Sequence, residues 1–97
     1  MARIEVSAAA VDDLERLIYT HSLPLDTKER VKRSLRPLEP FPLLGAALDG
    51  RWSSFRFVLG PWRWMLIVYT YFEADDRVVI VTIQDGRSSR APRVQAG

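Results

Sequence analysis

The chain has 97 residues and a mass of 11.1 kDa. We expect one domain, because a second core would need roughly 50 residues of its own. Hydrophobic residues make up 47% and charged residues 27%, which is typical of a globular protein and excludes a disordered or collagen-like chain. The sequence has no cysteine, which excludes a disulfide framework, a thiolate zinc site and a cysteine nucleophile.

Charge is distributed unevenly along the chain. The whole sequence holds 14 basic and 12 acidic residues, a net charge of +2. Residues 1–50 hold seven basic and eight acidic residues, whereas residues 51–97 hold seven basic and four acidic ones. All basic residues of the second half are arginines, whose planar guanidinium group suits phosphate recognition. Genomic base composition explains the arginines equally well, so both interpretations stay open.

The sequence begins with the pattern of a short strand followed by a helix. Ile4 and Val6 alternate with charged residues, which is typical of a strand with one face on a core. Ser7 is a suitable N-cap, and apolar residues then recur at helical spacing. We therefore expect a helix from residue 8 to about residue 21.

A second helix is expected to begin near Asp26. Asp26 and Glu29 have the spacing of a capping box, and Val31 and Leu35 follow at helical spacing. Pro37 lacks an N–H group and should end or kink this helix, before an extended linker.

After Gly50 the hydrophobic pattern changes from helical spacing to the alternation of strands. We expect a half-buried strand over residues 55–59 and a central strand over residues 62–72, which are apolar on both faces. An acidic turn over residues 73–76 should precede a third strand over residues 78–83, which are rich in β-branched side chains.

The predicted order of elements is β-α-α-β-β-β. It corresponds to an α+β fold in which two N-terminal helices pack on one face of an antiparallel sheet. We expect the domain to span residues 1–91, and residues 92–97, which have no periodicity, to form a flexible tail.

Three arginines of the second half are candidates for chemistry. Arg56 alternates with Phe55 and Phe57, so it should lie on the sheet face that the helices leave uncovered. Arg63 lies on the adjacent predicted strand, and Arg87 follows the last one. Converging guanidinium groups would suit RNA phosphates, an acidic peptide or the charge of a reacting phosphate. Ordinary solvent-facing charges on strands are the alternative.

The other polar and aromatic candidates favour structural roles. His21, the only histidine, is expected to be a surface or C-cap residue at the end of the first helix. The acidic residues 73–76 fall in a predicted turn, so we expect a turn, with no metal ion and no other cofactor. Trp52, Trp62 and Trp64 can stack on bases, but packing in a core or an interface is the favoured interpretation.

Several segments, taken in order, resemble a known protein family. They are the opening strand with an acidic first helix, Pro42-Leu43-Leu44-Gly45, Leu48-Asp49-Gly50-Arg51-Trp52, Phe55-Arg56-Phe57, and the run from Trp62 to Arg87. Over residues 2 to about 91, this ordered set resembles the RelE/ParE superfamily of toxins from bacterial type II toxin–antitoxin modules.

The resemblance implies a small toxin that a co-encoded antitoxin protein binds and holds inactive. RelE-like members cut mRNA in the ribosomal A site without a metal, by helping a 2′-hydroxyl attack the adjacent phosphate. ParE-like members bind DNA gyrase and poison it. By their positions in the RelE-like pattern, Arg56, Arg63 and Arg87 would stabilise phosphate charge.

Departures from the RelE-like pattern favour the ParE-like interpretation. No tyrosine or histidine follows Tyr71, so the usual terminal proton-transfer residue is missing. Tyr69 follows Arg63 by six residues instead of three, which puts Leu66 in the arginine position, and Val58 stands at a lysine position. We therefore expect inhibitory binding of DNA gyrase. The alternatives are mRNA cleavage, by charge stabilisation alone or with Tyr69 or Tyr71 as an unusual base, and a non-toxic antitoxin-binding module.

The expected location is the cytoplasm, with no membrane partner. Glu5 lies where a signal peptide would need apolar residues. The longest apolar run, residues 64–69, is far shorter than the roughly 18–20 residues that span a bilayer. The expected partners are an antitoxin, in a hetero-oligomer, and either DNA gyrase or the ribosome with its mRNA.

Overall fold

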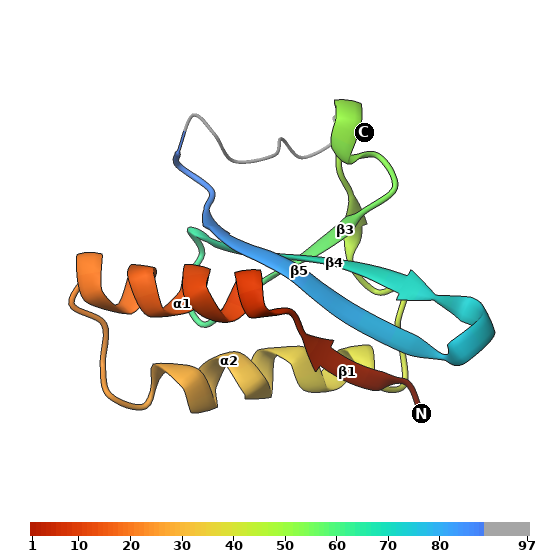
Figure 1. Cartoon of the computed structure of the whole chain (residues 1–97), viewed down its shortest axis with the longest axis horizontal. Coiled ribbons are helices and arrows are strands. Elements are labelled where there is room, and N and C mark those ends of the chain that lie inside the picture. Colours follow the sequence, from red (N-terminus) through yellow and green to blue (C-terminus); the bar gives the residue numbers. More distant parts are fainter. Residues whose placement is uncertain (89–97) are drawn as a thin grey trace.

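Residues 1–88 are described by the structure, a computed structural model. They form a five-stranded sheet with two helices on one face (Figure 1). The strands are β1 (Arg3–Val6), β2 (Ala46–Ala47), β3 (Arg56–Leu59), β4 (Met65–Phe72) and β5 (Arg77–Asp85). The helices are α1 (Ala8–Thr20) and α2 (Thr27–Leu35), and the 3₁₀ turns are η1 (Arg36–Leu38), η2 (Gly50–Trp52) and η3 (Glu73–Asp75). The predicted α+β class is confirmed, and the tail expected over residues 92–97 lies outside the described residues.

The strand order across the sheet is β1-β5-β4-β3-β2. β2 to β5 pair antiparallel, but β1 runs parallel to β5, so the sheet is mostly rather than wholly antiparallel. The predicted order lacks β2, because a strand of two alanines is too short to show alternation. β4 lies in the middle of the sheet, as its apolar sequence predicts.

α1 begins where the sequence predicts. The hydroxyl of Ser7 accepts a hydrogen bond from Ala10 N at 3.1 Å and caps the helix. The same hydroxyl donates to Val81 O at 3.2 Å, which attaches the start of α1 to β5. At the other end, His21 is the C-cap, and its backbone N–H donates to Leu17 O.

α2 begins near the predicted residue, but the predicted capping box is wrong. Within the described chain the Asp26 side chain makes no capping hydrogen bond, and it accepts one from Arg30 Nε at 2.9 Å. The backbone of Asp26, with φ −90° and ψ 13°, is not extended as it is in most capping residues, so the carboxylate is turned away from the helix start. α2 ends at Leu35 and Pro37 lies in η1, as predicted.

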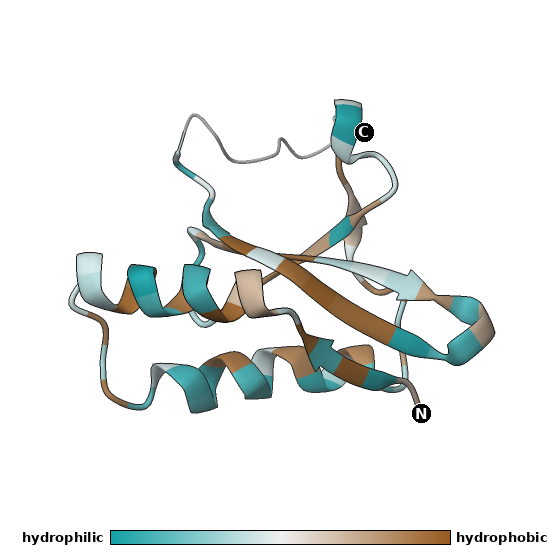
Figure 2. Ribbon diagram, in the orientation of Figure 1, coloured by the Kyte–Doolittle hydropathy of each residue, from teal (hydrophilic) through white to brown (hydrophobic). Residues whose placement is uncertain are grey.

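The main core lies between the helices and the sheet. Figure 2 shows hydrophobic residues recurring along both helices and along β5, which lie on either side of this core. Its buried side chains include Leu14, Val31, Leu35, Ile67, Tyr69 and Ile80. The other face of the sheet carries a smaller cluster, whose buried members are Leu48, Leu66 and Val68. Both faces of β4 are therefore buried, which explains its unbroken apolar sequence.

The two hairpins differ slightly from the predictions. β4 starts at Met65, because the preceding residues turn and Gly60 N donates to Met65 O at 2.9 Å. The acidic segment forms η3, as predicted, and Asp76 follows in the left-handed conformation with φ 47°. No helix within residues 1–88 combines the length and the hydrophobicity needed to cross a bilayer.

Candidate functional site

Two of the three candidate arginines lie at the same end of the sheet. Arg63 is in the turn before β4, and Arg87 follows the end of β5. Gly86 N donates to Trp64 O at 2.6 Å, so these two segments are neighbours. Arg63 is exposed and has no hydrogen-bond or ion-pair partner among residues 1–88.

Arg56 lies elsewhere, and the prediction that it lies on the uncovered face is wrong. It pairs with Tyr69 in the sheet, so its side chain is on the face that the helices cover. Its Nη1 donates to Gly45 O at 2.8 Å and to Leu43 O at 3.4 Å. Tyr69 lies four positions after Met65, the start of β4, so Arg56 is about 13 Å along the sheet from the end that carries Arg63 and Arg87. Phe57 packs in the smaller cluster on the other face; alternation identifies two faces but does not say which one meets the helices.

Arg87 forms a side-on ion pair with Asp85. Its Nε and Nη2 lie 3.0 and 2.9 Å from the two carboxylate oxygens, and its backbone N donates to Oδ1 at 2.9 Å. These hydrogen bonds hold the pKa of Asp85 far below its usual range, and one from His21 lowers that pKa further. The side-on geometry leaves Nη1 of Arg87 for another oxyanion, on a side chain that is 64% exposed.

His21 joins this ion pair from the first half of the sequence. Its Nε2 lies 3.0 Å from Asp85 Oδ2, and its Nδ1 lies 2.9 Å from Thr20 Oγ1. Its ring stacks on Trp64, with centroids 4.6 Å apart and planes inclined by 14°. The Arg87 guanidinium also lies over Trp64, at 5.2 Å from the ring centroid. We refer to His21, Trp64, Asp85 and Arg87 as the Asp85 cluster.

The Asp85 cluster rests on a column of stacked groups. The rings of Trp62 and Trp64 stack with centroids 6.1 Å apart, and Arg30 of α2 lies 5.9 Å from the Trp62 centroid. Trp62 and Trp64 pack against the main core, and Trp52 packs against the smaller cluster. The predicted packing role of the tryptophans is confirmed. Trp62 and Trp64 also form the stacked rings against which His21 and Arg87 pack.

The prediction for His21 is correct but incomplete. His21 is the C-cap of α1, as expected, and it is also part of the only imidazole–carboxylate pair that residues 1–88 contain. A signal for this contact is the length of α1. The helix starts beside Val81, and its 13 residues rise about 20 Å, which is enough to bring its end level with the end of β5.

Neither tyrosine considered as a base belongs to the cluster. Tyr69 is fully buried, and its hydroxyl accepts a hydrogen bond from Gly45 N at 2.8 Å. Burial raises the pKa of Tyr69. The Tyr71 hydroxyl donates to Asp76 Oδ1 at 2.7 Å, and this bond raises the pKa of Tyr71. A raised pKa makes both phenols harder to deprotonate, so neither is suited to act as a base.

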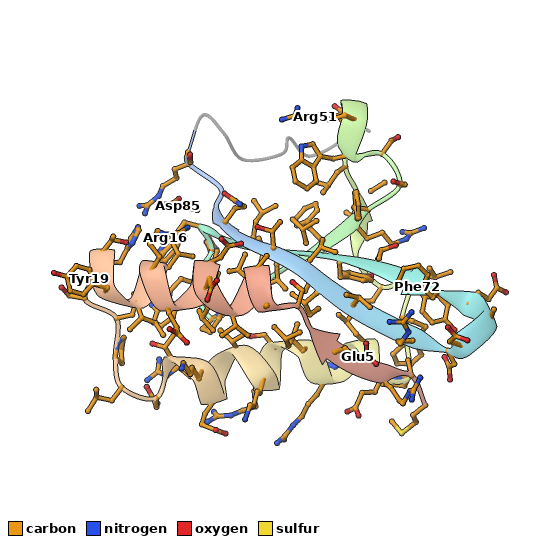
Figure 3. The ribbon with its side chains drawn as sticks, in the orientation of Figure 1. Glu5, Arg16, Tyr19, Arg51, Phe72 and Asp85 are labelled. Atoms are coloured by element: carbon orange, nitrogen blue, oxygen red, sulfur yellow. The ribbon has the colours of Figure 1, made fainter. Side chains whose placement is uncertain are left out.

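A polar cavity of about 190 Å³ lies beside Asp85, between α1 and the end of β5. Asp13, Arg16 and Gln84 are among its lining residues. Figure 3 shows Arg16 and Asp85 at the same end of the molecule, with Arg51 well away from them on η2. Within residues 1–88 no three acidic or histidine side chains are placed to hold a metal ion.

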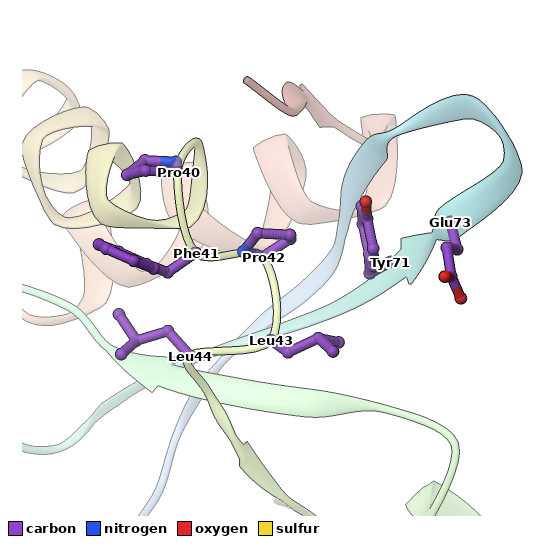
Figure 4. A pocket seen from close by; sticks show the side chains of 7 residues that line it. All are labelled: Pro40, Phe41, Pro42, Leu43, Leu44, Tyr71 and Glu73. Carbon is purple, nitrogen blue, oxygen red and sulfur yellow. The ribbon is translucent and has the colours of Figure 1, made fainter.

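The linker between η1 and β2 forms an apolar groove at a different place. The groove encloses about 560 Å³ and is lined by Pro40, Phe41, Pro42, Leu43, Leu44, Tyr71 and Glu73 (Figure 4). Phe41, Leu43 and Leu44 are 63%, 58% and 57% exposed. Adjacent apolar side chains with this exposure are typical of a surface that binds another protein.

Solved structures share the fold, although the sequence matches no protein-family model and no curated protein. The toxin–antitoxin complex RelBE2 from Mycobacterium tuberculosis is similar over 87% of this chain and 96% of that chain, with a TM-score of 0.66 and 19% identity. The intact E. coli RelBE toxin–antitoxin complex is similar over 91% and 100%, with a TM-score of 0.64 and 11% identity. The chromosomal ParDE toxin–antitoxin system of P. aeruginosa is similar over 98% of both chains, with a TM-score of 0.64 and 13% identity.

The similarity covers nearly the whole chain rather than one segment. RelBE and ParDE match equally well, so the shape of the backbone does not distinguish a RelE-type from a ParE-type protein. The chain therefore has the fold of the RelE/ParE superfamily of toxins, the family that its sequence resembles.

Proposed function

We propose that this protein is the toxin of a bacterial type II toxin–antitoxin module, active in the cytoplasm until a co-encoded antitoxin protein binds it. The shared fold and the ordered sequence resemblance support the proposal. Induced expression of the chain in a bacterial host should stop growth. Co-expression of the proposed co-encoded antitoxin should restore growth. Normal growth without an antitoxin would contradict toxicity and favour a non-toxic antitoxin-binding module.

We further propose that the toxin acts by cleaving RNA. The Asp85 cluster carries this proposal, because it gathers an imidazole and a partly free guanidinium around one carboxylate. Arg63, the residue before Trp64, is exposed and has no partner among residues 1–88. Metal-free phosphodiester cleavage needs positive charge on the phosphate and a group that moves a proton. One of the departures behind the gyrase interpretation is the missing terminal tyrosine or histidine, and His21 supplies an imidazole from another part of the chain.

Two arginine variants test RNA cleavage with purified protein and mRNA on translating ribosomes. Mapping of 5′ ends should show cuts inside codons with the wild-type protein. Arg87→Ala should slow cleavage by about 10²-fold or more, because it removes the donor that faces the phosphate charge. Arg51→Ala is the matched control, since Arg51 is an exposed arginine far from the cluster (Figure 3). Equal cleavage by the two variants would contradict a role for Arg87.

Inhibitory binding of DNA gyrase is the second candidate, and the apolar linker groove favours it. A toxin that works by binding needs a surface of this kind for its protein target. This candidate predicts blocked supercoiling without mRNA cuts. It also predicts that Leu43→Asp, in the groove, abolishes toxicity while Arg87→Ala leaves it intact.

A further inference from the structure

We propose that His21 is the proton-transfer residue of this site, and that its Nδ1 takes the proton of a ribose 2′-hydroxyl in a bound RNA strand. The inference rests on the RNA-cleaving function proposed above. It goes further by assigning a general base, at the end of α1, to a chain that lacks the terminal proton-transfer residue of the RelE-like pattern.

The contact with Asp85 determines which nitrogen of His21 is basic. The ionised Asp85 carboxylate only accepts hydrogen bonds, and its Oδ2 lies 3.0 Å from Nε2. Nε2 must therefore carry a proton in the neutral ring, which places the lone pair on Nδ1. Nδ1 is the nitrogen that can accept a proton from a substrate.

The neighbour of Nδ1 is already an alcohol. Thr20 Oγ1 lies 2.9 Å from Nδ1, within the range required between a general base and the hydroxyl that it deprotonates. Thr20 is the last residue of α1 and is exposed, and the hydrogen bond from its hydroxyl to Leu17 O is long at 3.5 Å, so its side chain can rotate away. A ribose 2′-hydroxyl can then take the place that the threonine hydroxyl occupies.

Trp64 and Asp85 hold the ring firmly and leave Nδ1 in contact with Thr20. Trp64 stacks on its face at 4.6 Å, and Asp85 is itself fixed by the side-on pair with Arg87. The His21 side chain is still 28% exposed, so an RNA strand can reach it. A base held by a stacking contact and by an oriented carboxylate is preorganised for proton transfer.

Charges around the ring match those that develop during the reaction. Asp85 and the C-terminal end of α1 both stabilise the positive charge that His21 acquires with the proton. Nη1 of Arg87 and the exposed Arg63, which has no partner among residues 1–88, can stabilise the negative charge on the phosphate oxygens.

The chemical step balances with RNA as the only reactant. The 2′-hydroxyl loses its proton to Nδ1 of His21, and the 2′-oxygen forms a bond to the adjacent phosphorus. The bond from phosphorus to the 5′-oxygen breaks, and that oxygen takes a proton from solvent. His21 then returns its proton to solvent. The products are a 2′,3′-cyclic phosphate end and a 5′-hydroxyl end.

Two substitutions separate proton transfer from packing. His21→Phe keeps an aromatic ring on Trp64 but has no nitrogen, and His21→Gln keeps a hydrogen-bond donor for Asp85 but does not titrate. We expect both to cleave ribosome-bound mRNA about 10²–10⁴-fold more slowly than the wild-type protein. Free imidazole should speed cleavage by a His21→Gly protein. An mRNA with a 2′-O-methyl group at the cut site should stay intact.

The outcomes distinguish this assignment from the broader proposal. If the wild-type protein cuts the mRNA and a folded His21→Gln protein is within about threefold of it, the assignment of His21 is overturned and RNA cleavage stands. If the wild-type protein cuts neither free nor ribosome-bound mRNA, both proposals fail. Urea unfolding of each variant shows whether a slow rate reflects lost folding, and a rate loss that only follows instability also overturns the assignment.

Discussion

His21 and Asp85 are 64 residues apart in the sequence, and their side chains meet at 3.0 Å. The same carboxylate oxygen accepts a hydrogen bond from Arg87 Nη2 at 2.9 Å. This contact joins the end of α1 to the end of β5, and it places a group able to move protons beside one able to hold a phosphate. The stability of this end of the fold and the proposed chemistry therefore depend on one carboxylate.

Asp85→Asn should lower stability in a pH-dependent way. The folded-state pKa of Asp85 lies below its unfolded value. The contribution of Asp85 to the free energy of unfolding is therefore fully present above the ordinary carboxyl pKa of about 3.9, and it is lost as pH falls through the folded-state value. We expect a loss of about 1 kcal/mol at neutral pH, because the Arg87 side of the pair is open to solvent. The difference between the two proteins in urea unfolding should shrink below about pH 4. A constant difference down to about pH 3 would contradict this account.

Tyr69→Phe should destabilise the fold far more than Tyr71→Phe. Tyr69 is fully buried, and without its hydroxyl the Gly45 N–H loses its acceptor in the core, at a cost of about 1–3 kcal/mol. The Tyr71 hydroxyl bonds Asp76 at an exposed turn, where water can replace it. Chemical unfolding of both variants measures the difference. Similar losses of unfolding free energy in the two variants would show that the hydrogen bond from Gly45 N to the Tyr69 hydroxyl does not stabilise the fold.

Asp13→Ala should loosen the attachment of α1 to β5. Asp13 Oδ2 accepts hydrogen bonds from Thr82 Oγ1 and from Ile83 N, beyond the point where β1 stops covering the edge of β5. Removing the Asp13 carboxylate should lower the free energy of unfolding by about 1–3 kcal/mol, because the Ile83 N–H group at the edge of β5 loses its acceptor. Asp12→Ala is the matched control, since Asp12 has no partner within residues 1–88. Hydrogen exchange at Ile83 should speed up in the Asp13 variant alone.

Arg56→Ala should affect stability rather than chemistry. Its guanidinium donates to the carbonyl oxygen of the buried Gly45, so its loss leaves this acceptor unsatisfied, at about 1–3 kcal/mol. Cleavage of mRNA per folded molecule should be unchanged, because Arg56 lies about 13 Å along the sheet from the Asp85 cluster. A loss of cleavage rate as large as that of Arg87→Ala would show that Arg56 takes part in the reaction and would contradict a purely structural role.

Local patterns predicted most of the elements. The spacing after Ser7 predicts α1, Pro37 predicts the end of α2, and the apolar run before residue 73 predicts a central strand. These features depend on neighbours within one or two turns of chain, so they are readable without the fold. The capping box at Asp26 failed because the carboxylate binds Arg30 instead, a competition that spacing does not reveal.

The sequence by itself determined the α+β class, the resemblance to the toxin family and the absence of cysteine chemistry. Only the tertiary structure decided that Arg56 faces the helices and that His21 meets Asp85. The physical reason is the parallel pairing of β1 with β5, which starts α1 beside Val81. From that point the helix rises about 20 Å and reaches the end of β5. A contact over 64 residues is set by this pairing and by the length of the helix; the length is predictable from the sequence, but the pairing leaves no mark in the residues around His21.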